Sequence, residues 1–183
     1  MGKSAVFLDR DDTVIKNVPY LGDPKLVKLM PGVSEALAKL QQADFLLIVI
    51  SNQSGVGRGL ITKEQVRSVD AKMEELLGLK NIFAAYAHCF AAPGDPYDDR
   101  RKPSPAMLFE TAADLPIDLK KSFMVGNRLS DIQAGNSAGC QTVLLSLCVP
   151  PDEMEEASRL ASFVAADWPK AGEWILKKAA QTK

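Results

Sequence analysis

The sequence lacks long hydrophobic segments and has no excess of charge of either sign. Its longest apolar run, at 45–50, is far shorter than the roughly 20 residues that a helix needs to cross a bilayer. Lysine and arginine number 22 against 23 aspartates and glutamates, for a net charge of -1. Bulk electrostatic binding to nucleic acid or to acidic membranes is therefore not expected.

Cysteine and histidine are also scarce, with three cysteines and one histidine. An odd, small number of cysteines gives no disulfide framework, and a single histidine excludes a zinc module built mainly from histidines. No apolar signal segment precedes the first predicted strand. Together these features predict a cytoplasmic protein in a reducing environment.

What is present is an ordinary globular composition. The chain has 183 residues, of which 46% are hydrophobic and 25% charged. This length and composition fit one domain that buries a sizeable core. We expect residues 1–183 to form a single domain and the protein to be a monomer.

Short apolar runs alternate with longer segments of helical periodicity. The runs are apolar throughout, as in strands buried on both faces of a parallel sheet. This order predicts an α/β fold, a Rossmann-like, doubly wound and mainly parallel sheet with helices on both faces, in three layers. Strands are predicted at 5–8, 45–50, 82–89, 122–125, 142–145 and 161–164, and helices at 33–40, 62–77, 104–113, 129–138 and 168–179.

Polar residues follow these strands directly, at the edge where open α/β sheets bind ligands. Asp9 and Asp11 place two like charges together, which at about 4 Å costs about 4 kcal/mol at an effective dielectric constant near 20. A Mg²⁺ ion would relieve this repulsion and prefers such oxygen ligands. One carboxylate can then act as nucleophile and the other as general acid and base.

Asp9-x-Asp11 alone would equally fit a solvated loop or a helix cap. The phosphate chemistry is favoured because Ser51, Lys102 and the pair Asn127 and Asp131 occupy corresponding places after later strands. A hydroxyl and an ammonium group suit the oxygens of a transferring phosphoryl group.

These residues resemble the four motifs of the haloacid dehalogenase (HAD) superfamily of aspartate-nucleophile phosphatases, in the same order. Within it, the sequence resembles the D-glycero-D-manno-heptose-1,7-bisphosphate phosphatases, whose product feeds lipopolysaccharide precursors. Histidinol-phosphate phosphatases share this local architecture and remain an alternative. The segments that carry the resemblance are 7–13, 20–24, 29–33, 51–59, 101–105 and 124–131.

The resemblance implies an HAD-like fold without a large cap domain, in which the long irregular segments 14–30 and 91–103 shape the pocket. It implies that Asp9 is the nucleophile, that Asp11 is the acid and base, and that Ser51 and Lys102 stabilise the phosphoryl group. Mg²⁺ would bind Asp9, Asp11 and Asn127, with Asp131 contributing directly or through water. The implied contacts to a small phosphorylated metabolite are Asn17, Val18, Pro19, Tyr20, Ser51, Asn52, Gln53, Ser54, Arg101, Lys102 and Arg128.

The sequence departs from the family pattern in three places. Asn127 stands where the family usually has aspartate, which predicts weaker Mg²⁺ binding, although an asparagine there would also fit a helix N-cap. Asp12 replaces the usual glycine and either disfavours an anionic substrate or points away from it. Of the four zinc ligands found in many relatives, only Cys89 is present, with Asp98 and Arg100 at later positions, so no structural zinc is expected.

Two further hypotheses remain open at this stage. Asn127 and Asp12 motivate a catalytically weakened domain that binds a phosphorylated ligand, because a fold does not fix a function. A polynucleotide phosphatase lacks support because the sequence has no extended basic stripe. Glu153, Glu155 and Glu156 are interpreted as a charged helix face, and His88 as a packed residue near a strand end.

Overall fold

The computed structural model describes residues 2–95 and 99–181. Its centre is a six-stranded, all-parallel sheet in the order β3-β2-β1-β4-β5-β6. The doubly wound α/β fold predicted from the sequence is confirmed. The strands are β1 (Ala5–Leu8), β2 (Leu46–Asn52), β3 (Ala85–Cys89), β4 (Phe123–Gly126), β5 (Gln141–Leu145) and β6 (Phe163–Ala165).

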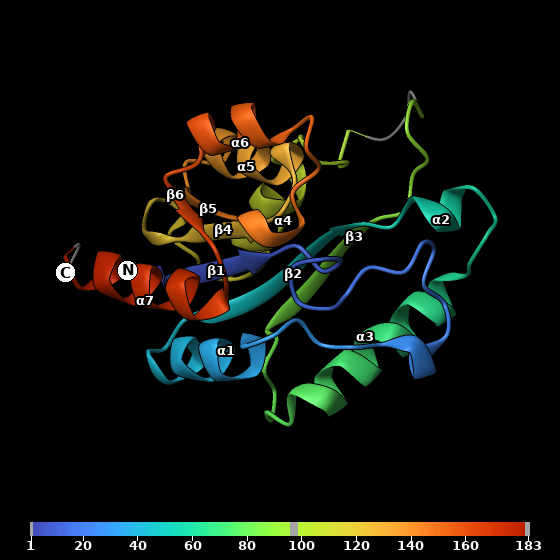
Figure 1. Cartoon of the computed structure of the whole chain (residues 1–183), viewed down its shortest axis with the longest axis horizontal. Helices are drawn as coiled ribbons and strands as arrows, with labels where there is room; N and C mark the ends of the chain where they lie inside the picture. Colours follow the sequence, from blue (N-terminus) through green and yellow to red (C-terminus); the bar gives the residue numbers. More distant parts are fainter. Residues whose placement is uncertain (1, 96–98, 182–183) are drawn as a thin grey trace.

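Helices cover both faces of the sheet (Figure 1). The core on one face contains side chains of α1, α3 and α7, and the second face packs against α4 and α5, with α6 lying on α5. The helices are α1 (Val33–Gln42), α2 (Ser54–Gly57), α3 (Lys63–Leu77), α4 (Ala106–Asp114), α5 (Leu129–Ser137), α6 (Met154–Leu160) and α7 (Trp168–Ala180).

Strand β1 shows why these runs are apolar throughout. All four of its residues are completely buried. Val6 and Leu8 pack into the core beneath α1, α3 and α7, whereas Ala5 and Phe7 pack into the core beneath α4 and α5. Successive side chains of a strand point to opposite faces, so a strand covered on both sides needs apolar residues at every position.

The sheet reverses its winding direction between β1 and β4. From β1 the chain continues to β2 and β3 on one side, and β4 leads to β5 and β6 on the other. The backbone N–H of Asp9, the first residue after β1, donates a 2.9 Å hydrogen bond to the Val125 carbonyl of β4. Asp9 therefore lies at the topological switch point, where folds of this kind bind ligands.

The connections differ from the predicted elements at a few positions. The strand predicted at 82–89 begins only at Ala85. Asn81 has a positive φ of 49°, and the chain turns there before it pairs with β2. The 3-10 helix η1 (Pro24–Leu26) lies in the predicted irregular segment 14–30. The capping box of Thr62 and Gln65 at the start of α3 is confirmed. In the described part of the chain, the helices are too short or too polar to cross a membrane.

Candidate active site

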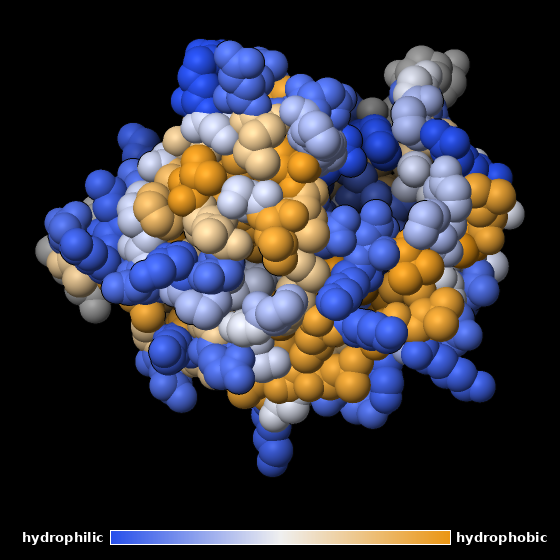
Figure 2. All heavy atoms as spheres, in the orientation of Figure 1, coloured by the Kyte–Doolittle hydropathy of each residue, from blue (hydrophilic) through white to orange (hydrophobic). Residues whose placement is uncertain are grey.

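A cavity of about 670 Å³ opens at the carboxyl ends of β1, β2 and β4. Figure 2 shows a hollow with hydrophilic walls on this side of the molecule. The structure brings together every residue that the sequence predicted for catalysis, substrate or metal binding. The cavity is lined by Asp9, Asp11, Asn17, Val18, Pro19, Tyr20, Ser51, Asn52, Gln53, Ser54, Arg101, Lys102, Asn127, Arg128 and Asp131, among others.

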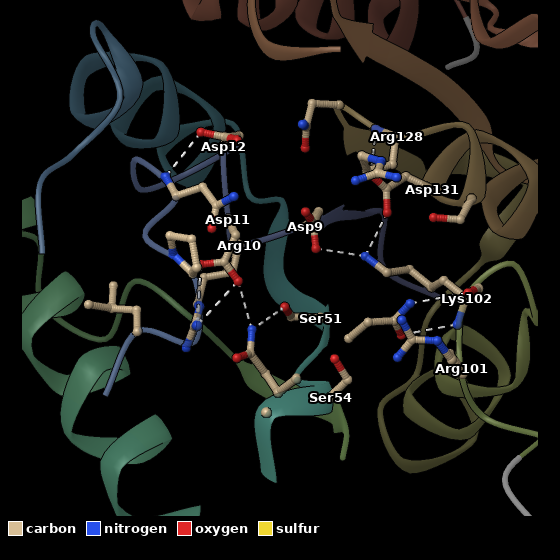
Figure 3. A pocket seen from close by; sticks show the side chains of 18 of the residues that line it. Asp9, Arg10, Asp11, Asp12, Ser51, Ser54, Arg101, Lys102, Arg128 and Asp131 are labelled. Atoms are coloured by element: carbon tan, nitrogen blue, oxygen red, sulfur yellow. Dashed lines mark hydrogen bonds and ion pairs between the residues drawn. The ribbon is translucent and has the colours of Figure 1, made fainter. Parts of the chain in front are cut away.

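A buried lysine joins two carboxylates on the floor of the cavity (Figure 3). The Lys102 ammonium lies 2.7 Å from Asp9 Oδ1 and 2.6 Å from Asp131 Oδ1. It also donates a 2.8 Å hydrogen bond to the Ile50 carbonyl. Burial alone would lower the pKa of Lys102, but Asp131 and Asp9 raise it above its ordinary value. We call Lys102, Asp9 and Asp131 the lysine cluster.

Local contacts explain how residues far apart in sequence form the lysine cluster. The Asn52 side chain, at the end of β2, accepts a hydrogen bond from the Lys102 backbone N–H and donates one to its carbonyl, both of 3.1 Å. On the other side, a Cβ at Gly126 would lie 2.2 Å from Asp131 Oδ2. Only glycine at this position lets the Asp131 carboxylate approach the strand end so closely.

Asp9 is a buried carboxyl group whose pKa departs from its ordinary value. Burial raises its pKa to about 7, with further upward contributions from Asp131 and Asp11, while Lys102 opposes the rise. The residue is only 7% exposed. A carboxylate in this position gains from additional positive charge.

A second buried cation lies on the wall of the cavity. Arg10 is 1% exposed, and its Nη2 lies 3.3 and 3.2 Å from the two Asp11 carboxylate oxygens. Its Nη1 donates a 3.1 Å hydrogen bond to Asp70 Oδ1 on α3. Burial opposes the charge of Arg10, but Asp11 and Asp70 keep its pKa raised. We call Arg10, Asp11 and Asp70 the arginine cluster.

Gln53 connects the arginine cluster to Ser51. Its side-chain nitrogen donates a 2.7 Å hydrogen bond to Asp11 Oδ2 and a 2.8 Å hydrogen bond to Ser51 Oγ. Ser51 therefore accepts from Gln53, which leaves its own hydroxyl hydrogen available for a ligand oxygen. Gln53, predicted from the sequence as a substrate contact, thus also positions Asp11 and Ser51.

The two unusual residues of the site make specific hydrogen bonds. Asn127 Oδ1 accepts from the Thr13 hydroxyl at 3.3 Å, and its Nδ2 donates to the Cys148 carbonyl at 3.0 Å. Asp12 has a positive φ of 56°, and its carboxylate accepts a 3.0 Å hydrogen bond from the Asn17 backbone N–H. In Figure 3 the Asp12 carboxylate points away from Asp9.

The donor atoms of the cavity fit a hard divalent cation. Asp9 and Asn127 line the cavity, and their side chains carry oxygen atoms, the type of ligand that Mg²⁺ prefers. Burial and the neighbouring carboxylates raise the pKa of Asp9, so its ionised form gains from a neighbouring cation. Both Asp131 oxygens face protein donors, with Oδ1 against Lys102 and Oδ2 accepting from the Arg128 backbone N–H. A direct contact of Asp131 to Mg²⁺ stays a prediction, while its contact to Lys102 is observed.

Cys89 is the one residue that matches the zinc ligands of many relatives. It is a buried core residue, and Asp98, at a later ligand position, lies outside the described residues. Across residues 2–95 and 99–181, no group of three or more histidine, cysteine, aspartate or glutamate side chains is arranged to hold a metal ion.

Glu153 is a site residue that the sequence did not indicate. The sequence predicts Glu153 to be part of a charged helix face, but the residue lines the cavity and binds the Arg128 guanidinium. Its Oε2 also accepts a 2.7 Å hydrogen bond from the Leu129 backbone N–H at the start of α5. The hydrogen bonds to Glu153 raise the pKa of Arg128. No local pattern links a glutamate before α6 to an arginine before α5, so this contact needed the fold.

The rim of the cavity is built from the first long connection. Tyr20 is 45% exposed, and a Cβ at Gly55 would lie 2.8 Å from its ring atom Cδ1. The ring therefore lies directly on the backbone that follows Ser54 in α2. Arg101 donates a 3.3 Å hydrogen bond to the Ala91 carbonyl, which joins the two ends of the second long connection, 91–103.

Comparisons with known proteins identify relatives of this chain. The model of a HAD-hydrolase-like family matches residues 99–169. The D-glycero-beta-D-manno-heptose-1,7-bisphosphate 7-phosphatase of Photorhabdus laumondii is 34% identical over 96% of this chain and 98% of its own length. The D-glycero-D-manno-heptose-1,7-bisphosphate 7-phosphatase of Thermosynechococcus vestitus is 31% identical over 96% of both chains.

A solved structure of a heptose bisphosphate phosphatase has the same fold as this chain. The D,D-heptose 1,7-bisphosphate phosphatase from B. bronchiseptica, crystallised with magnesium and phosphate, superposes with a TM-score of 0.80 at 28% identity, over 96% of this chain and 99% of that chain. Full-length similarity above 30% identity and the shared architecture lead to one assignment. The chain belongs to the D-glycero-D-manno-heptose-1,7-bisphosphate 7-phosphatase family of HAD-like hydrolases and is a phosphatase.

Proposed function

We propose that this phosphatase removes the 7-phosphate of D-glycero-D-manno-heptose 1,7-bisphosphate through an aspartyl-phosphate on Asp9. The observation that carries the proposal is the contact of the buried Asp9 carboxylate with Lys102, 2.7 Å apart, on the floor of the cavity at the switch point. Relatives of the same length with this activity in their names support the choice of substrate.

In the first half of the reaction, a carboxylate oxygen of Asp9 attacks phosphorus and the bond from phosphorus to the sugar oxygen breaks. Asp11 gives its proton to the departing sugar oxygen, which leaves as an alcohol. The Lys102 ammonium, the Ser51 hydroxyl and the nearby backbone N–H groups hold the phosphoryl oxygens while their charge changes.

In the second half, Asp11 takes a proton from a water molecule that attacks the phosphorus of the aspartyl-phosphate. The bond from phosphorus to the Asp9 oxygen breaks and inorganic phosphate leaves, which restores the Asp9 carboxylate and the protonated Asp11 carboxyl group. The arginine cluster suits this double role because Arg10 and Gln53 fix Asp11 from the protein side, while 25% of its side chain stays exposed.

Asp9, the Asp11 carbonyl and Asn127 are the residues proposed to hold Mg²⁺. When bound there, the ion offsets the negative charge shared by the nucleophile and the phosphoryl group. Its presence in a related phosphatase crystallised with magnesium and phosphate supports this assignment. Asn127 contributes a neutral oxygen, so we expect weaker binding than with an aspartate at this position.

The rest of the cavity is proposed to bind the sugar and its second phosphate. Arg101 and Arg128 supply cationic groups for phosphate, and the segment 17–20 together with Asn52, Gln53 and Ser54 surrounds the remaining space. Binding of a phosphate by Arg128 would compete with Glu153, which holds its guanidinium. We further propose that the protein acts as a monomer in the cytoplasm, without nucleic acid or membrane partners.

A phosphate-release assay tests this function directly. The substrates are heptose 1,7-bisphosphate, the heptose 1-phosphate, histidinol phosphate and a panel of hexose bisphosphates, each with Mg²⁺ and with a chelator. We expect Mg²⁺-dependent release from the 7-position of the heptose bisphosphate at the highest kcat/KM. Asp9→Asn is the matched control, because it keeps the size of the side chain and removes the nucleophile.

Each alternative gives a different result in this assay. A higher kcat/KM for histidinol phosphate would replace the proposed substrate. Binding of the sugar phosphate without release, together with failure of beryllofluoride to stabilise the protein through Asp9, would indicate the weakened ligand-binding domain. Full activity of Asp9→Asn would exclude the proposed nucleophile.

A further inference from the structure

The arginine cluster continues from the cavity wall to the far edge of the sheet. Arg10 Nη1 lies 3.1 Å from Asp70 Oδ1 on α3. Asp70 Oδ2 in turn lies 2.8 Å from His88 Nε2 on β3. The Asp70 and His88 side chains are 9% and 8% exposed. A buried chain of polar contacts therefore runs from Asp11 to β3, the strand at one edge of the sheet.

We propose that Asp70 is a positioning residue of the phosphatase, which orients Arg10 so that its guanidinium fixes the Asp11 carboxylate. The inference rests on the proposed role of Asp11 as general acid and base. Asp70 and His88 belong to none of the sequence motifs that indicated the active site, and neither lines the cavity where the reaction is proposed to occur.

The geometry of the guanidinium group supports this role. One terminal nitrogen, Nη2, contacts both oxygens of Asp11, while the other, Nη1, contacts Asp70. A guanidinium is planar and its donors are fixed relative to one another. The contact at Nη1 therefore determines where Nη2 lies. His88 completes the arrangement by holding the second oxygen of Asp70.

Precise placement matters for Asp11 because its carboxyl group must reach the oxygen that leaves phosphorus. Misplacement by about 1 Å can slow a reaction about 100-fold. Gln53 holds Asp11 Oδ2 at 2.7 Å, but it lies on the same loop as the proposed substrate contacts. Arg10, by contrast, is anchored to α3, an element of 15 residues packed into the core.

The chain also offers a matched control for a purely structural effect. Glu74 lies one helical turn after Asp70 on α3, and it accepts a 2.6 Å hydrogen bond from the Tyr86 hydroxyl on β3. Both pairs thus tie α3 to β3, but no contact links Glu74 to Arg10 among the described hydrogen bonds and ion pairs. Loss of the Glu74 contact perturbs the same packing without touching the arginine cluster.

The test compares Asp70→Ala, Asp70→Asn and Glu74→Ala on two kinds of ester. One is an alkyl phosphate, the heptose bisphosphate or, if it is not hydrolysed, the best sugar phosphate of the panel. The other is p-nitrophenyl phosphate, whose leaving group departs without protonation. Thermal unfolding of each variant verifies folding, and Asp70→Asn, which keeps an acceptor oxygen, provides the comparison where Asp70→Ala does not fold.

We expect Asp70→Ala to lower kcat/KM for the alkyl ester by about 10- to 100-fold. Its kcat/KM for the aryl ester should fall by less than about 3-fold. This constant covers only the steps up to departure of the leaving group, which needs no proton from Asp11 in the aryl ester, and does not include the later attack of water. Asp70→Asn should retain intermediate activity on the alkyl ester. Glu74→Ala should change both esters equally and little.

Two results would overturn the inference, and they are distinguishable. If Asp70→Ala and Asp70→Asn lower kcat/KM for both esters by the same factor, or for neither, Asp70 supports only the fold. If Asp11→Asn itself fails to lower kcat/KM for the alkyl ester more than for the aryl ester, the proposed function of Asp11 is wrong and this inference falls with it.

Discussion

The lysine cluster and the arginine cluster share one arrangement but differ in the cation and in the exposure of the carboxylate that it holds. Each is a buried cation between two carboxylates, of which one follows β1 and the other comes from a helix. Lys102 joins Asp9 to Asp131 of α5, and Arg10 joins Asp11 to Asp70 of α3. The two clusters thus connect Asp9 and Asp11, the aspartates proposed to be catalytic, to opposite faces of the sheet.

The difference lies in the shape of the cation and in exposure. Lysine is a compact charge, and it lies with the Asp9 side chain, 10% exposed, at the floor of the cavity. Arginine is a planar fork, and the Asp11 side chain that it holds is 25% exposed. A compact charge suits stabilisation of a nucleophile and a phosphoryl group, whereas a fork suits the orientation of an acid that must reach its substrate.

The largest expected effect on activity comes from replacing Asp9, the proposed nucleophile. Asp9→Asn should lower kcat by at least about 10⁴-fold, because no other group can form the covalent intermediate. Release of phosphate from the preferred substrate measures this. Activity of Asp9→Asn within 100-fold of the unchanged protein would remove the functional distinction between the clusters.

The same variant should change how the stability of the metal-free protein depends on pH. Since burial raises the pKa of Asp9 to about 7, the proton on Asp9 stabilises the folded state. This contribution is complete below the ordinary pKa of 3.8 and is lost as the pH rises through about 7. Asp9→Asn should therefore unfold at a higher temperature than the unchanged protein at pH 8, with a smaller difference at pH 5.

Magnesium provides the control for that measurement. At pH 8 it should raise the unfolding temperature of the unchanged protein more than that of Asp9→Asn, because binding to the folded state stabilises it. A difference between the two proteins that does not vary with pH would show that Asp9 carries no perturbed proton.

Loss of either cation should have the next largest effect. Lys102→Met and Arg10→Met each leave two carboxylates without their buried counter-charge, which costs about 3–5 kcal/mol in the free energy of unfolding. Denaturant unfolding at neutral pH measures this cost. With Arg10→Met as the comparison, Lys102→Met should lose more activity on p-nitrophenyl phosphate, because only the lysine contacts the nucleophile. Equal losses on this ester would contradict the different roles of the clusters.

Replacing Asn127, another residue that lines the cavity, should have a moderate effect on Mg²⁺ binding and on stability. Asn127→Asp should tighten Mg²⁺ binding by about 10-fold, since a charged ligand replaces a neutral one. It also places a carboxylate oxygen where Nδ2 now donates to the Cys148 carbonyl, which should destabilise the metal-free protein by about 1–3 kcal/mol. Calorimetric titration with Mg²⁺ measures the first effect, and unchanged affinity would reject Asn127 as a metal-site residue.

Asp12, beside the arginine cluster, should have the smallest effect. Asp12→Gly removes a side chain at positive φ but also the acceptor for the Asn17 N–H, so the two changes in stability partly cancel. Because the carboxylate points to Asn17, KM for the phosphorylated substrate should change by less than about 2-fold. A several-fold fall in KM would show that Asp12 repels the substrate.

That Asp9, Lys102 and Asp131 share one site was predictable from sequence, whereas Asp70 of the arginine cluster was not. Asp9 follows a predicted strand, Lys102 precedes a predicted helix and Asp131 lies in the first turn of another. The carboxyl ends of parallel strands share one edge of the sheet, so these residues were expected to lie close together. Asp70 lies in the middle of α3, where its neighbours in sequence are ordinary helix residues. Glu153 was missed for the same reason, since nothing near it in sequence points to Arg128.

By itself, the sequence determined the alternation of strands and helices, the doubly wound sheet and the set of residues at its carboxyl edge. Periodicity and strand-end position are local properties, and they are sufficient because parallel strands share one edge. Only the tertiary structure decided which buried charges pair, that Asn127 is held between Thr13 and the Cys148 carbonyl, and that Asp11 is connected to β3. Such contacts depend on distances between side chains from different elements, which no local pattern encodes.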